Sequence, residues 1–275
     1  HILVSKGVEF WVAIDEGRVV AARGIDTDLV VKPFHQAGVV VSLRQFTVNA
    51  FNHHHGIQAE ERFDLNPEHF ESDFDEDGVH REMTVGDVTA VTLFQAALAT
   101  PVQKLPWTEA ARARIQEGER LFGEIGCTTC HLPAMELESP RFIEPNPFNP
   151  GDTFRDILQS VSFDMTQEGQ LPRLPIAASG KAVVRAYTDL KRHNLCDPPD
   201  FPDAIRFFCN EEFDQNRPEQ DGRPGAEFFL TRKLWDVGNS APYGHRGDVT
   251  TISEAIYYHA GEARTSRDAF VMLAL

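Results

Sequence analysis

The sequence predicts a mainly α-helical protein with long irregular loops, preceded by a mixed, partly β segment at the amino terminus. Amphipathic stretches that begin at helix-capping residues indicate the helices. Residues 132–175, rich in Pro and Phe, and residues 194–225 indicate the loops. Short β-branched and aromatic runs separated by glycines occupy the first 50 residues and indicate strands.

The expected elements follow in chain order. Strands are expected at Glu9–Ile14, Val19–Ala22, Leu29–Val31 and Val39–Val41. Helical spacing follows from Leu43 to Ala50, and further helices are expected at Thr84–Ala99, from Thr108 to Ile125, at Ala182–Leu190 and after Thr251. We interpret residues 1–103 as part of an amino-terminal domain or inter-domain segment, and residues 104–275 as a second domain.

The charge and hydropathy of the sequence exclude some classes of binding partner. The 275 residues include 26 Lys+Arg and 42 Asp+Glu, for a net charge of −16, and 41% are hydrophobic, enough for a packed core. Such acidity argues against nucleic acid as a partner. No apolar run approaches the ~18 residues of a transmembrane segment. Because the chain begins at His1 without a leader and ends in an apolar stretch, we expect it to be a piece of a longer protein.

The pentapeptide Cys127-Thr128-Thr129-Cys130-His131 carries the chemistry. C-x-x-C-H is the attachment pattern of c-type haem. Two thiols on one turn can reach the vinyl groups of one porphyrin, and the adjacent imidazole can bind its iron. The pattern predicts Cys127 and Cys130 as attachment points of one haem c, His131 as its proximal ligand, and a cytochrome c-like fold for residues 104–275.

Two other interpretations of the motif remain. A zinc half-site would need a second ligand pair, and Cys196 and Cys209 are too far apart for a second C-x-x-C. A thioredoxin-like redox pair would follow a strand, whereas this motif follows a predicted helix.

Covalent haem implies a periplasmic or otherwise extracytoplasmic location. Cys196 and Cys209 fit an oxidising compartment as a disulfide, and the alternative is two free buried thiols.

The last predicted helix offers a second iron ligand. Thr251 and Glu254 form a capping box that fixes its start. His259 then falls on an apolar stripe with Ile252 and Ile256, and we expect it to be the distal ligand. A core histidine bonded to a backbone carbonyl is the alternative, and the competing ligands are His245, Tyr243, Met135, Met165 and Met272.

Several segments together resemble the di-haem cytochrome c peroxidase superfamily, in its di-haem oxidoreductase (thiol-oxidoreductase-like) branch, with bacterial rubber oxygenases as more distant relatives. These segments are DLVVKPF (28–34), FNHHHGIQAEERF (51–63), GDVTAVTLFQAAL (86–98), GERLFGEIGCTTCHLP (118–133), DLKRHNL (189–195) and LWDVGNSAPYGHRGDVTTISEAI (234–256).

The resemblance implies two c-type haem domains, of which this chain carries the carboxy-terminal, electron-transferring one. It implies a distal ligand about fourteen residues after the histidine of PYGHRG, which again is His259, with His245 between the haem edge and the neighbouring loops. Since the chain has no second C-x-x-C-H, we expect the other haem domain upstream of His1 or lost. His53, His54 and His55 would then be candidates for the distal pocket of that upstream haem, and a solvated turn is the alternative.

An acidic segment, residues 60–77, suggests a second cofactor. Asp73, Asp75 and Asp77 alternate before Gly78, like the first half of a calcium-binding loop, although the usual Glu at the twelfth position is replaced by Thr84. The alternatives are bound calcium and a solvated acidic loop.

Three functions are compatible with these features. The resemblance implies the electron-transfer domain of a periplasmic, peroxidase-like di-haem oxidoreductase, which passes electrons to a second haem where peroxide, oxygen or a substrate reacts. The second is a stand-alone electron-carrier cytochrome that serves a small redox protein, and the third a structural or partner-binding haem domain. Because a bis-His iron has no open position, this chain alone is not expected to be catalytic.

Overall fold

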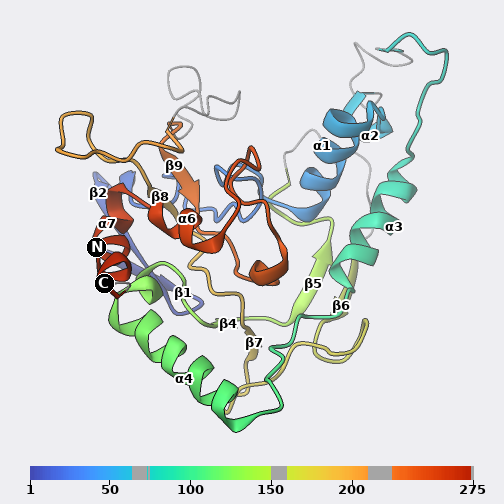
Figure 1. Ribbon diagram of the computed structural model, residues 1–275. Coiled ribbons are helices and arrows are strands. Elements are labelled where there is room, and N and C mark those ends of the chain that lie inside the picture. Colours follow the sequence, from blue (N-terminus) through green and yellow to red (C-terminus); the bar gives the residue numbers. More distant parts are fainter. Residues whose placement is uncertain (64–72, 74, 150–159, 210–224, 274–275) are drawn as a thin grey trace.

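The computed structural model describes residues 1–63, 73, 75–149, 160–209 and 225–273 (Figure 1). Within these residues the protein is mixed α/β, with 29% in helices and 18% in strands. The prediction of a mainly α-helical fold is therefore wrong. The difference arises because the expected loops contain short strands, which are too brief to show an alternation in the sequence.

A three-stranded antiparallel sheet begins the chain, formed by β1 (Ile2–Ser5), β2 (Val8–Asp15) and β3 (Arg18–Ala22). In β2 the residues alternate, with Val8 and Phe10 buried and Trp11 exposed, so one face of the sheet is covered. The two strands predicted here are confirmed.

The two runs that follow do not form strands. Residues 29–31 and 39–41 lie in irregular structure, and the only pairing near them is an isolated bridge between Phe34 and Val40. Val31, from the first of these runs, instead packs against the core cluster of Val8, Phe10 and Met135.

Three helices gather on one side of the molecule (Figure 1). They are α1 (Leu43–His55), α2 (Glu60–Phe63) and α3 (Val85–Ala96). α3 has the predicted capping box of Thr84 and Asp87. α1 and α3 share an apolar cluster that includes Val48 and Val88, so these helices pack as a pair.

The other helices of the described residues follow position 103. They are α4 (Glu109–Glu124), η1 (Cys127–Thr129), η3 (Val237–Asn239), α6 (Ile252–Tyr257), η4 (Gly261–Ala263) and α7 (Arg264–Leu273). Figure 1 shows α7 and one end of α4 close to both chain ends. Thr108 caps α4 and Thr251 caps α6, as predicted.

Three antiparallel strand pairs follow η1, and three of their strands lie in the predicted loop 132–175. They are β4 (Met135–Leu137) with β7 (Ala182–Val184), β5 (Arg141–Glu144) with β6 (Val161–Asp164), and β8 (Arg192–Asn194) with β9 (Phe228–Leu230). The helix predicted at Ala182–Leu190 is wrong. Its first residues form β7, and Tyr187 and Leu190 adopt left-handed backbone angles that no α-helix allows.

Many contacts join the residues before and after position 103, including a core cluster, a buried ion pair and several hydrogen bonds. Val8 and Phe10 of β2 share a core cluster with Met135 of β4. The Arg44 side chain of α1 pairs with Glu144 of β5, both without solvent exposure beyond 1%. The amino-terminal sheet thus packs against the segment that follows the C-x-x-C-H motif.

None of the helices in the described part of the chain is both long and apolar enough to cross a bilayer.

Candidate functional site

The C-x-x-C-H motif lies in the tight turn that ends α4. Gly126 adopts a left-handed conformation, with φ of 85°, and a Cβ there would lie 2.9 Å from Ser266 Oγ on α7. Glycine at this position therefore allows the helix to stop and the turn to approach α7. η1 follows, and the His131 amide donates to the Cys127 carbonyl at 3.0 Å. Both cysteines and the histidine thus belong to one turn.

The His131 ring is oriented by the backbone. Its Nδ1 lies 2.9 Å from the Tyr187 carbonyl oxygen, which can only accept, so Nδ1 carries the proton and Nε2 is the bare nitrogen. Burial lowers the pKa of His131 below its usual value, although the backbone carbonyls of Tyr187 and Arg232 act in the opposite direction, and the lowered pKa favours the neutral ring. The Phe122 ring, 6.3 Å away between centroids, packs beside it. A neutral imidazole held in this way is the form that binds a metal.

His259 has the same arrangement at the end of α6. Its Nδ1 lies 2.7 Å from the Ala255 carbonyl oxygen, which again leaves Nε2 bare. Burial lowers the pKa of His259, and the nearby His131 acts in the same direction. The structure thus shows the carbonyl bond of the alternative interpretation, and this bond does not exclude a ligand role for His259, because the carbonyl uses only one ring nitrogen.

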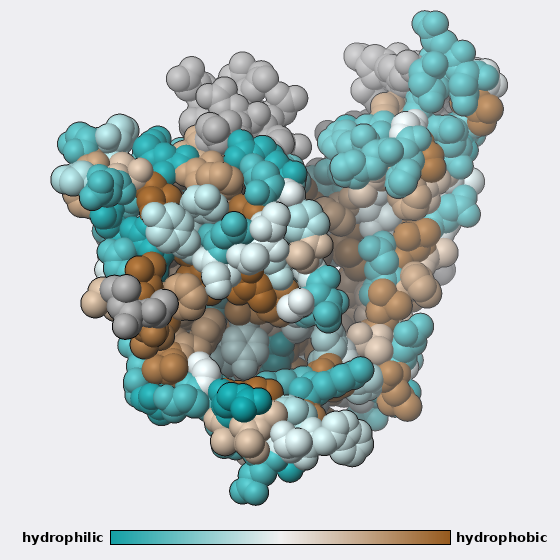
Figure 2. Space-filling view, viewed as in Figure 1, coloured by the Kyte–Doolittle hydropathy of each residue, from teal (hydrophilic) through white to brown (hydrophobic). Residues whose placement is uncertain are grey.

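The surroundings of the motif fit a haem. α4 is amphipathic, yet it contributes no buried residue, and its apolar residues Ile115, Leu121 and Phe122 are only partly covered. Figure 2 shows a hollow on this face beside α4, with apolar surface next to it. Two neutral imidazoles with bare Nε2 atoms, two thiols on one turn and a partly covered apolar face match the donor set of a bis-His haem c.

The two motif cysteines do not fit a redox pair. Burial raises the pKa of Cys127, whereas catalytic thiols in redox motifs have a lowered pKa. The motif also follows α4 rather than a strand. These findings argue against the thioredoxin-like interpretation.

A second group of ligand-type atoms lies against Cys130. Its sulfur, a ring nitrogen of His193 and a carboxylate oxygen of Asp189 are within 4.8 Å of one another. Such a set is compatible with zinc in chemical type. However, both His193 nitrogens already lie 2.9 Å from carboxylate oxygens, one of Asp189 and one of Glu262, so neither is a bare donor.

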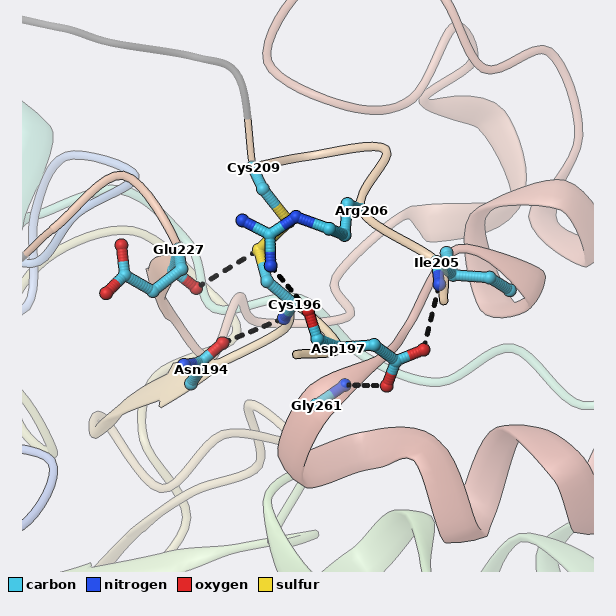
Figure 3. Close-up of a disulfide and its surroundings, with 8 residues drawn as sticks. All are labelled: Asn194, Cys196, Asp197, Ile205, Arg206, Cys209, Glu227 and Gly261. Atoms are coloured by element: carbon cyan, nitrogen blue, oxygen red, sulfur yellow. Dashed lines mark hydrogen bonds between the residues drawn. A yellow bond between two sulfur atoms is a disulfide. The ribbon is translucent and has the colours of Figure 1, made fainter. Parts of the chain in front are cut away.

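A disulfide joins Cys196 and Cys209, the pairing expected from the sequence (Figure 3). Next to it, Asp197 accepts hydrogen bonds from the Ile205 amide at 2.9 Å and the Gly261 amide at 3.0 Å. Gly261 directly follows the His259–Ala260 pair, so the segment around the disulfide fixes the turn that carries His259.

The other candidate ligands lie elsewhere. Met135 is buried in the cluster below β2, and Met272 is 66% exposed on α7. Met165 lies in the turn after β6. The Tyr243 hydroxyl donates to the Val237 carbonyl at 2.6 Å. His245 is exposed in the following turn, with its ring centroid 6.4 Å from that of His35.

The three consecutive histidines lie in the last turn of α1 rather than in a loop. His53, His54 and His55 are all exposed, and Gly56 caps the helix behind them. The structure adds His35 to this region, a residue that sequence reasoning missed. Burial, His245 and Arg232 lower the pKa of His35 to about 4, and the nearby His53 contributes. A lone histidine in an irregular run carries no signal that would have identified it.

The acidic segment brings its alternating carboxylates together. Asp73, Asp75 and Asp77 place one oxygen each within 4.8 Å of the others. Asp73 accepts from the Gly78 amide at 2.8 Å, and Asp75 from the Gln58 side chain at 2.7 Å. Residues 64–72 and 74 lie outside the described residues. Calcium at this loop stays a prediction.

Sequence reasoning also missed the polar residues around Cys130. Asp189 and His193 lie four residues apart within the segment DLKRHNL (189–195), but Glu262 lies 69 residues after His193. Comparison with protein-family models, curated proteins and solved structures finds no significant match to this chain.

Proposed function

We propose that this chain is a c-type haem electron-transfer domain, with Cys127 and Cys130 as the attachment residues, His131 as the proximal ligand and His259 as the distal ligand. The observation that carries the proposal is the matched pair of imidazoles. Each histidine donates through Nδ1 to a backbone carbonyl, at 2.9 Å for His131 and 2.7 Å for His259, and keeps Nε2 bare.

The chain's own residues would orient and shield the cofactor. Haem c supplies reversible one-electron transfer when it is bound. The Tyr187 and Ala255 carbonyls fix the two rings, while Phe122 and the apolar face of α4 exclude water from them. With both axial positions taken by histidines, the domain would transfer electrons without binding peroxide itself.

We further propose that the domain serves a periplasmic di-haem oxidoreductase and passes electrons to a second haem where peroxide, oxygen or a substrate reacts. The support is the resemblance of the quoted segments to that superfamily. The alternative is a stand-alone electron carrier. An upstream C-x-x-C-H with a five-coordinate iron in the full-length protein favours the enzyme, and its absence favours the carrier.

The test uses the chain exported to the periplasm of a bacterium with c-type haem maturation. The intact mass of the chain is expected to increase by one haem. Cys127→Ala/Cys130→Ala abolishes the increase, because no thioether can form. Cys196→Ser/Cys209→Ser is the matched control, since it removes the same number of thiols and leaves the haem in place. A colourless chain that carries zinc would contradict the proposal and support the Cys130–Asp189–His193 group as a metal site.

A further inference from the structure

The ring of His193 lies between two carboxylates. Its Nε2 is 2.9 Å from Asp189 Oδ2, and its Nδ1 is 2.9 Å from Glu262 Oε2. An ionised carboxylate accepts hydrogen bonds and donates none. Both ring nitrogens must therefore carry protons, which makes the side chain an imidazolium with a positive charge.

Both carboxylates are held in the ionised form by other donors. The Lys191 amide donates to Asp189 Oδ1 at 2.9 Å, and the Lys191 ammonium lies 3.6 Å from Asp189 Oδ2. The Asn194 amide donates to Glu262 Oε1 at 2.9 Å. Burial acts to raise the pKa of both acids, but these contacts and His193 outweigh it and lower them.

The interior location strengthens the pairing. The Asp189 side chain has no solvent exposure, and the His193 side chain has 13%. Burial opposes the charge on His193, but its hydrogen bonds with Asp189, Cys130 and Glu262 prevail and raise its pKa to about 11. The imidazolium is thus a largely buried charge that the folded protein stabilises, rather than an exposed surface charge.

This charge lies against the second attachment cysteine. The Cys130 sulfur is within 4.8 Å of a His193 nitrogen and an Asp189 oxygen. If Cys130 is joined to a porphyrin, groups that touch its sulfur are close to the ring. A positive charge there favours the reduced iron, and a buried carboxylate favours the oxidised iron, because oxidation adds one positive charge.

We propose that His193 is an electrostatic positioning residue: a fixed imidazolium beside Cys130 that offsets the carboxylates of Asp189 and Glu262 on its two ring nitrogens and raises the reduction potential of the attached haem. The inference rests on the proposed haem function for its effect on the potential. The charge of His193 itself depends only on this chain's residues.

The charge is tested first on the wild-type chain, whether or not haem is attached. Long-range ¹H–¹⁵N NMR on histidine-labelled protein at about pH 8 distinguishes protonated from bare ring nitrogens, and His193→Gln assigns the signal. We expect two protonated nitrogens on His193, although an ordinary histidine with a pKa of about 6.5 is neutral there. One bare nitrogen would overturn the proposal.

The effect on the haem is tested by redox titration. His193→Gln removes the positive charge that lies closest to both acids and leaves Asp189 with only the Lys191 ammonium at 3.6 Å, so we expect the reduction equilibrium constant to fall about tenfold, or about 59 mV for a one-electron couple. Asp189→Asn/His193→Gln removes one negative charge as well and should recover much of the loss. His80→Gln, at an exposed position, is the matched control and should leave the potential unchanged.

The outcomes separate the two claims. An unchanged potential in His193→Gln, with haem attached and the fold retained by circular dichroism, overturns the role of His193 and leaves the haem function standing. A chain that takes up no haem overturns the proposed function and the tuning role together, and the NMR result alone then decides the charge of His193.

Discussion

At the scale of single residues, the backbone determines which imidazole nitrogen can bind a metal. The Tyr187 and Ala255 carbonyls each hold the Nδ1 proton of one histidine. Nε2 of His131 and of His259 is then the only bare ring nitrogen, and burial keeps both rings neutral by lowering their pKa. This orientation fits the ligand roles that we propose for the two residues.

Substitution of His259 tests its role as distal ligand. His259→Met is expected to keep the iron low-spin and raise the reduction potential, because a thioether stabilises the reduced iron better than an imidazole does. His259→Ala is expected to produce a high-spin iron. Optical and electron paramagnetic resonance spectra measure both. If neither variant changes the spectrum, then His245 or a methionine holds the sixth position.

His193 gives a pH dependence of stability with a defined sign. Its pKa in the folded protein is about 11, above the usual value of a histidine, about 6.5. Its contribution to folding is therefore complete below about pH 6.5 and is lost as the pH rises through the folded value. The difference in free energy of unfolding between wild type and His193→Gln should be largest near pH 6 and shrink towards pH 10. Urea titrations measure it, with His80→Gln as control, and a difference independent of pH would contradict the charge assignment.

At the scale of elements, the position of His259 depends on a six-residue helix, α6. His259, which we propose as the distal ligand, follows this helix. α6 begins at a capping box in which Thr251 Oγ1 accepts from the Glu254 amide at 3.1 Å. So short a helix depends on its cap, since few of its backbone groups bond within it. The segment around Asp197 then holds the turn that follows His259. The position of His259 is thus fixed from both ends.

Removal of one cap should therefore affect the iron as well as the fold. Thr251→Ala is expected to lower the free energy of unfolding by about 1 kcal/mol and to increase the high-spin fraction, because α6 frays and His259 is less well held. Thr108→Ala removes the equivalent cap of α4, where the Thr108 side chain accepts a hydrogen bond from the Ala111 amide. It should cost a similar free energy without a spectral change. Equal spectral effects of the two variants would refute the role of α6.

Local signals account for what the sequence predicted correctly. Caps and periodicity are encoded within a few residues, and α3, α4 and α6 begin where Thr84, Thr108 and Thr251 indicate. The short strands depend on distant partners. β4 pairs with β7 across more than forty residues. The helix predicted at Ala182–Leu190 is therefore wrong because the local sequence does not show this distant strand, with which Ala182–Val184 pairs.

The candidate site likewise contains residues that the sequence predicts and contacts that it does not. The attachment turn and His259 are recognisable from spacing. The contacts that orient them are not, because the Tyr187 carbonyl is a backbone group that any residue offers. The Asp189–His193–Glu262 group joins positions far apart in the chain, and no pattern in the sequence connects Glu262 to the motif.

At the scale of the whole molecule, one buried cation connects the helical side to the strands. The Arg44 side chain is fully buried and donates to Glu61 at 2.9 Å, to Glu144 at 2.9 Å and to Thr89 at 2.7 Å. These partners come from α2, β5 and α3. The network therefore joins elements from both sides of residue 103.

Arg44→Met should lower the free energy of unfolding by about 3–5 kcal/mol, because it leaves two buried carboxylates without a counter-charge. Arg44→Met combined with Glu61→Leu and Glu144→Leu should recover part of the loss. Arg114→Met, at an exposed position of α4, is the control and should change stability by less than about 0.5 kcal/mol. Chemical denaturation measures all three, and a loss in Arg44→Met no larger than in the control would contradict the role of the network.

The most direct test of the account is the reduced alkaline pyridine spectrum of the purified, periplasmically matured chain. It reports whether a haem is present and whether its vinyl groups have been consumed by thioether bonds to Cys127 and Cys130. The account predicts the spectrum of a c-type haem at one equivalent per chain, retained after acid–acetone extraction. A colourless protein, or a haem that the extraction removes, would contradict it.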